Sequence, residues 1–114
     1  MPIRYHLYLP DAAHARGSDP SLAFRSQSAE GMATELQDAL RNDDLFLRWR
    51  VRQDDPDGVD PALGATDPGA RVQGAQRDLH VELVATTSLP GNLLKQRLRW
   101  LAGSGWELRD VTAA

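Results

Sequence analysis

Residues 45–52 constrain the fold most, because large apolar side chains and basic side chains alternate along Leu-Phe-Leu-Arg-Trp-Arg-Val-Arg. Alternation with a period of two is typical of a strand that turns one face to the core and the other to solvent. The pattern therefore predicts a strand over residues 45–53 with Arg48, Arg50 and Arg52 on its outward face. Guanidiniums about 7 Å apart on one strand repel one another, so they require solvent, carboxylates or an anionic partner.

Two other segments show the same alternation. Residues 3–9 place apolar side chains on one side and end at Pro10, and residues 78–85 alternate in the same way. A last strand is expected at 106–111. Residues 21–27 are short and less regular, and we expect them to form an additional hairpin strand.

Two segments have the apolar spacing of helices. The first is capped by Ser28, whose hydroxyl can accept hydrogen bonds from free amides, and it ends at Asn42. The second has Thr87 or Ser88 as its cap and Pro90 in its first turn. Their apolar stripes are Met32, Ala33, Leu36 and Leu40 in the first helix and Leu93, Leu94, Leu98 and Leu101 in the second.

Residues 54–77 contain three prolines and four glycines and show no apolar periodicity, so we expect a flexible acidic loop there. Five aspartates and one arginine give residues 54–74 a charge of −4. The whole chain has a net charge of −3, so the remainder carries +1. A body this close to neutral does not favour a dedicated nucleic-acid binder.

The order of these elements predicts a single α+β domain over residues 1–114. Each strand has one apolar side and each helix one apolar stripe, which fits a two-layer sandwich. We expect an antiparallel sheet of four to five strands with two helices on one face, in a ferredoxin-like split β-α-β arrangement. The other face of the sheet is then open.

The open face is the candidate functional surface. Arg48, Arg50 and Arg52 are expected to lie beside the strand that carries His80 and Glu82. The next strand would add Arg4, His6 and Tyr8 to the same face. One interpretation is a ladder of cross-strand ion pairs, and the other is a binding surface for a carboxylate, a phosphate or an acidic peptide.

The sequence contains no catalytic or cofactor motif. It has no cysteine, and its histidines do not have the spacing of a zinc site, so we expect neither a metal nor a cofactor. The best acid-base group is His6 and His80 with Glu82, which makes a simple acid-base enzyme the alternative function. Weak nucleic-acid binding is a third hypothesis. The predicted outward face offers one aromatic side chain, Tyr8, for stacking on a base.

Residues 98–111, Leu-Arg-Trp-Leu-Ala-Gly-Ser-Gly-Trp-Glu-Leu-Arg-Asp-Val, are similar to the ending of several small bacterial domains, in which a helix is followed by glycine, Gly-Trp-Glu-Leu and a strand. The similarity covers about one-eighth of the chain and implies no functional residue.

We therefore expect a small non-enzymatic binding or assembly module. Its partners would be an acidic protein, a small anionic ligand, or a second copy in a homodimer that hides the outward Phe46 and Val84. No apolar stretch reaches the roughly 20 residues needed to span a bilayer, and the first residues do not resemble a signal peptide. A cytoplasmic location without membrane contact is expected.

Overall fold

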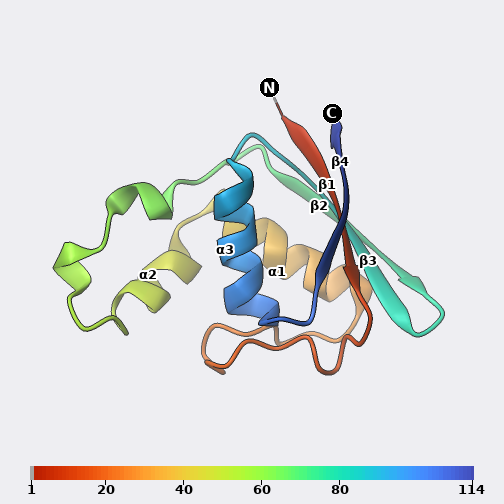
Figure 1. Ribbon diagram of the computed structural model, residues 1–114, viewed down its shortest axis with the longest axis horizontal. Helices are drawn as coiled ribbons and strands as arrows, with labels where there is room; N and C mark the ends of the chain where they lie inside the picture. The colour runs from red at the N-terminus through yellow and green to blue at the C-terminus, as the bar shows by residue number, and fades with distance from the viewer. Residues whose placement is uncertain (1) are drawn as a thin grey trace.

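The computed structural model describes residues 2–114 and has an α+β architecture (Figure 1). Within this range there are four strands, three α-helices and two short 3-10 turns. In chain order they are β1 (Ile3–Leu9), α1 (Ala29–Arg41), α2 (Asp44–Arg50), the turns Pro56–Gly58 and Pro61–Gly64, β2 (Arg71–Arg77), β3 (His80–Thr87), α3 (Gly91–Ala102) and β4 (Glu107–Ala113).

The four strands form one antiparallel sheet in the order β2-β3-β1-β4. Helix α1 connects β1 to β2, and α3 connects β3 to β4. Figure 1 shows both helices on the same side of the sheet. A bulge between His6 and Leu7 shifts the pairing of β1 with β4. Among residues 2–114, no helix lies over the opposite face of the sheet, as the one-sided apolar pattern of the strands predicts.

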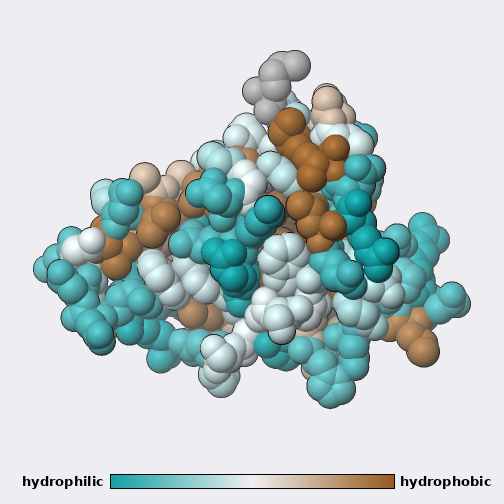
Figure 2. All heavy atoms as spheres, viewed as in Figure 1, coloured by the Kyte–Doolittle hydropathy of each residue, from teal (hydrophilic) through white to brown (hydrophobic). Residues whose placement is uncertain are grey.

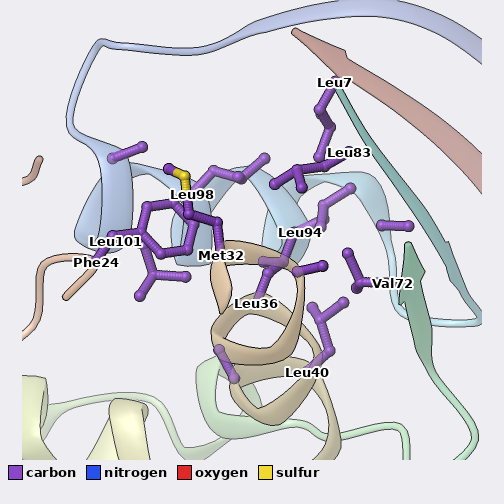
Figure 3. Close-up of a cluster of buried hydrophobic side chains, with 14 of the residues drawn as sticks. Leu7, Phe24, Met32, Leu36, Leu40, Val72, Leu83, Leu94, Leu98 and Leu101 are labelled. Carbon is purple, nitrogen blue, oxygen red and sulfur yellow. The ribbon is translucent and has the colours of Figure 1, made fainter. Parts of the chain in front are cut away.

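The core lies between the two helices and the sheet. Met32, Leu36 and Leu40 of α1 point toward Leu94 and the other buried leucines of α3, and the sheet closes the cluster (Figure 3). All three α1 residues are fully buried. Replacing such a side chain with alanine typically costs 2–5 kcal/mol, roughly. The two stripes read from the sequence are therefore confirmed as core.

The ends of α1 agree with the sequence, whereas the start of α3 differs. The Ser28 hydroxyl accepts a hydrogen bond from the Gly31 amide at 3.0 Å, so the expected cap is confirmed. Helix α3 follows Pro90 without a side-chain cap, so the cap expected from Thr87 or Ser88 is wrong. At its end, Gly103 adopts φ 63°, a left-handed angle that glycine accepts without steric cost.

The strand predicted at residues 45–53 is wrong, because this segment forms helix α2. Leu45, Phe46 and Trp49 lie on one side of the helical turn, and the first two are buried. Asp44 in the first turn and Arg48 in the last one have the signs that the helix dipole favours. The helix packs apolar residues at positions i, i+1 and i+4 against the core instead of the alternating set, and it leaves Leu47 and Val51 exposed.

The sheet contains a strand that the sequence did not predict, β2 (Arg71–Arg77). The loop predicted over 54–77 is therefore wrong in its last seven residues. Val72 is the one large apolar residue that β2 turns toward the core. Gly74 follows on the same side, where a Cβ atom would lie 2.3 Å from the carbonyl oxygen of Ala29 in α1. The strand thus lacks an apolar pattern because α1 packs directly on its backbone. Residues 21–27 form turns and coil rather than the extra strand.

Residues 44–66, which we call the α2 arm, extend away from the sheet beyond α3 (Figure 1). Trp49 stacks on Trp100 of α3 with ring centroids 4.8 Å apart. The buried guanidinium of Arg97 donates to the Ala65 carbonyl at 2.8 Å, and burial lowers its pKa. These two contacts join the arm to α3. None of the helices in residues 2–114 is long and apolar enough to cross a membrane.

Candidate functional site

Arg48, Arg50 and Arg52 do not lie on the open sheet face, because they belong to α2 and the turn that follows it. Each is bound within the chain, so these three guanidiniums fasten the α2 arm. Arg48 donates to the Ser21 carbonyl at 2.6 Å and lies 3.4 Å from the Asp44 carboxylate; Arg50 donates to the Pro56 carbonyl at 2.9 Å and lies 3.5 Å from Asp57; Arg52 lies 2.9 Å from Asp19.

The open face is arranged in cross-strand rows by the sheet register, and the outward residues of β1 and β3 are on it as predicted from their alternation. Arg4, His6, Tyr8, His80 and Glu82 all belong to this face. The arginines of β2 that complete the rows are Arg71 and Arg77. In strand order from β4 to β2, the rows are Thr112, Arg4, Thr86 and Arg71; Asp110, His6, Val84 and Gln73; Glu107, Tyr8, Glu82 and Ala75; and finally His80 with Arg77.

Tyr8 lies in a stacked cluster at one end of the face. The guanidinium carbon of Arg109 is 4.1 Å from the ring centroid of Tyr8, and the ring of His80 is 4.5 Å from it on a tilted plane. Glu82 lies 3.7 Å from the His80 ring nitrogen and 3.2 Å from Arg77. The Tyr8 ring already has partners, which leaves little of it for stacking on a nucleic-acid base.

His6 and His80 are not brought together. His6 is opposite Val84, and His80 is four residues from Val84 along β3. At about 3.3 Å per residue, this separates the two rows by roughly 13 Å. Only His80 is near Glu82, so the three residues do not form one acid-base group.

A hollow opens at the other end of the face, over the row that contains Arg4, Thr86 and Arg71. Its volume is about 710 Å³, and we call it the Arg4–Arg71 hollow. It is lined by Pro2, Arg4, Asp67, Gly69, Arg71, Gln73, Val84, Thr86, Thr87 and Ser88.

Arg4 and Arg71 flank Thr86 from the two neighbouring strands, so their backbones are about 10 Å apart at the usual strand spacing. Both are exposed. Within residues 2–114, neither forms an ion pair or a side-chain hydrogen bond. Most of the other arginines have such partners, as Arg77 does in Glu82. Two guanidiniums at this distance in water repel each other by only about 0.4 kcal/mol, so the fold tolerates them side by side.

Asp67 is the one carboxylate that lines this hollow, and its oxygens are occupied. One oxygen accepts from the Thr87 hydroxyl at 2.8 Å and from the Ser88 amide at 2.9 Å, and the other accepts from the Gly69 amide at 3.1 Å. The hydrogen bond from the Ser88 amide is the main reason that the pKa of Asp67 lies below its ordinary value of 3.8, although desolvation opposes the shift. Asp67 is thereby committed to holding the loop before β2 against the end of β3.

A second hollow, of about 450 Å³, lies between α1, α2 and residues 22–25. Its rim mixes acidic and basic side chains. Among them, Glu35 accepts from the backbone amides of Arg25 and Ser26, both at 2.9 Å. Arg48 on the rim is likewise bound to Ser21. Among residues 2–114, the charged side chains of this hollow without a partner have both signs, Asp38 and Asp43 against Arg25, whereas those of the Arg4–Arg71 hollow are both positive.

Sequence reasoning identified Arg4 as part of the site but missed Arg71, Gln73 and Thr86. The signal for Thr86 was its place in the alternation of β3, beyond the predicted end of that strand. No such signal existed for Arg71, because the strand that carries it has almost no apolar pattern. No group of three His, Cys, Asp or Glu residues in the described part of the chain is placed to hold a metal ion.

Comparisons with protein-family models, with curated proteins and with solved structures find no match for this chain.

Proposed function

We propose that this chain is a non-enzymatic binding module that uses the open sheet face to hold an anionic group of an acidic protein or of a small ligand. The observation that carries the proposal is the pair Arg4 and Arg71, two exposed guanidiniums without partners in residues 2–114 that flank Thr86 over one hollow. These residues replace the arginines at 48, 50 and 52 in the role that the sequence suggested. Guanidiniums bind carboxylates and phosphates through paired, charge-assisted hydrogen bonds.

The architecture that we propose for this module is the two-layer, ferredoxin-like split β-α-β arrangement. The strand order β2-β3-β1-β4 supports it, as do the two helices that connect alternate strands on one side of the sheet. In this arrangement the second face is free to meet a partner.

The expected affinity is modest. Two bidentate contacts to a charged group contribute roughly 1.5–3 kcal/mol each, and part of this is offset by the cost of fixing exposed side chains. A dissociation constant near 1 mM corresponds to about 4 kcal/mol. Tight recognition would then require further contacts between the partner and the rest of the face.

The test is NMR shift mapping of the full chain with citrate and with a hexaglutamate peptide, at low and high ionic strength. We expect shifts in the amides of residues 71, 73, 84 and 86 that weaken with salt. A variant with both Arg4→Gln and Arg71→Gln should lose these shifts. Arg77→Gln is the matched control, because Arg77 is on the same strand and face but is paired with Glu82. Shifts that survive in the double variant would refute the proposal.

The alternatives are separated by the same preparation. A homodimer through this face would sediment as a dimer and dissociate in the double variant, with Val84 in its interface. A nucleic-acid binder would be retained on heparin and released steeply by salt. Passage through such a column at low ionic strength would refute nucleic-acid binding.

A further inference from the structure

We infer that the Arg4–Arg71 hollow recognises a phosphomonoester of a small organic molecule in preference to a carboxylate. The inference rests on the proposed function, because it names the ligand class of the same site. It follows from the placement of the two arginines on either side of Thr86, from their combined charge, and from the size and lining of the hollow.

The two arginines lie on opposite sides of Thr86 in the sheet. Arg4 is on β1 and Arg71 on β2, with Thr86 of β3 between them in the same row. A carboxylate is planar, and one guanidinium fork satisfies both of its oxygens. Two guanidiniums that line one hollow from strands on either side of Thr86 match an anion whose acceptor oxygens point in several directions. The three terminal oxygens of a phosphoryl group have this arrangement.

Charge gives the same preference. The two guanidiniums contribute +2, and a phosphomonoester carries a charge of about −1.5 to −2 at neutral pH, whereas a carboxylate carries −1. Asp67 adds a fixed negative charge at the rim, but its oxygens already accept hydrogen bonds from Thr87, Ser88 and Gly69. It therefore does not pair directly with the arginines. Its repulsion is larger for a dianion than for a carboxylate, but two positive charges against one leave the net attraction larger for the dianion.

The volume indicates an ester rather than free phosphate. A hollow of about 710 Å³ is in the range of small-molecule sites, roughly 300–1,000 Å³, and is larger than one phosphoryl group requires. Pro2 and Val84 contribute apolar surface to its lining, and Gln73 contributes an amide. The organic part of a monoester would lie against these side chains while the phosphoryl group lies between the guanidiniums.

The experiment compares phenyl phosphate, benzoate and inorganic phosphate by NMR titration of the full chain at neutral pH. We expect phenyl phosphate to bind about tenfold more tightly than either of the others, with the largest shifts at residues 71, 84 and 86. Affinity for phenyl phosphate should fall as the pH is lowered through about 6, where the dianion takes up a proton, while benzoate binding should not change over that range.

Variants assign the effect to the two arginines. Arg4→Gln and Arg71→Gln should each reduce phenyl phosphate binding by about tenfold, and Arg77→Gln should leave it unchanged. Benzoate binding as tight as phenyl phosphate would overturn the phosphoryl preference and leave the binding module standing. Inorganic phosphate binding as tightly as phenyl phosphate would overturn the ester. If citrate, hexaglutamate and all three of these probes fail to bind, the proposed function itself fails.

Discussion

Replacing Gly74 with alanine tests the identity of β2, on which the position of Arg71 depends. Gly74 faces α1 from the middle of β2, and a Cβ atom built there would lie 2.3 Å from the Ala29 carbonyl oxygen. It would also lie 3.1 Å from the side chain of Leu83. The backbone oxygen cannot rotate away as a flexible side chain can, so either α1 or β2 must move.

The magnitude follows from the size of that overlap. Ordinary contacts of a Cβ atom begin at about 3.4 Å, so the strand and helix must separate by roughly 1 Å along this line. Overpacking of this kind typically costs about 1–3 kcal/mol. For a chain of this length, each kcal/mol lowers the Tm by about 4–6 °C, so Gly74→Ala should lower it by roughly 5–15 °C.

Gly91→Ala is the matched control. A Cβ atom at Gly91, the first residue of α3, would lie no closer than 3.4 Å to the Tyr5 hydroxyl oxygen. Alanine there should leave the Tm unchanged or raise it, because it reduces the freedom of the unfolded chain by about 0.4–1 kcal/mol. Thermal unfolding followed by circular dichroism measures both. Equal Tm values for the two variants would refute the direct packing of α1 on β2.

Three further predictions concern the α2 arm and the loop before β2. Arg97→Ala should lower the free energy of unfolding by about 3 kcal/mol, and Arg97→Met should lower it by about half as much, because Met refills the volume without burying a charge. Urea unfolding measures both variants, and equal losses would contradict the role of the buried volume. Trp49→Ala should cost about 1 kcal/mol through the lost stacking on Trp100, and it should raise hydrogen exchange in the arm. Unchanged exchange would argue against the stack. Asp67→Asn should lower the free energy of unfolding at neutral pH by about 1–2 kcal/mol. Because the pKa of Asp67 is lowered in the folded state, its carboxylate stabilises the fold above pH 3.8, and this stabilisation is lost as the pH falls through the folded-state pKa. The stabilities of wild type and variant should therefore converge in acid.

The sequence was sufficient to predict an element where its apolar pattern fits only one of the two periods, that of a strand or that of a helix. Apolar and polar side chains alternate along residues 3–9, and the strand predicted there is confirmed as β1. In the stripe Met32, Ala33, Leu36 and Leu40, the adjacent residues Met32 and Ala33 can share the buried face only in a helix, because a strand would turn them to opposite faces. The residues of β1 on the open face and His80, Glu82 and Val84 of β3 were therefore identified correctly, whereas Thr86 was missed.

The sequence failed where tertiary packing outweighs local pattern. Residues 45–52 were predicted as a strand because their apolar residues alternate, but the helix buries Leu45 and Phe46 and leaves Leu47 and Val51 exposed. Residues 71–77 read as a loop because Gly74 and Ala75 leave the strand without large side chains. The close approach of α1 requires the small residue at Gly74, so the feature that hides β2 in the sequence is the one that positions it in the fold.

Because residues 45–52 form a helix and residues 71–77 form a strand, the role of the many arginines differs from the one that the sequence suggested. All but one of the thirteen basic residues are arginines, and a run such as Arg48, Arg50 and Arg52 is the obvious candidate for a binding surface. In the structure, these arginines instead contact carbonyl and carboxylate oxygens of their own chain, and their guanidiniums hold the α2 arm in place. Arg4 and Arg71 are separated by 66 intervening residues in the chain and become neighbours only through the pairing of β1 and β2 with β3. The run of arginines in the sequence thus has a structural role here. The candidate for binding is the pair that the sheet brings together and that has no side-chain acceptor within residues 2–114.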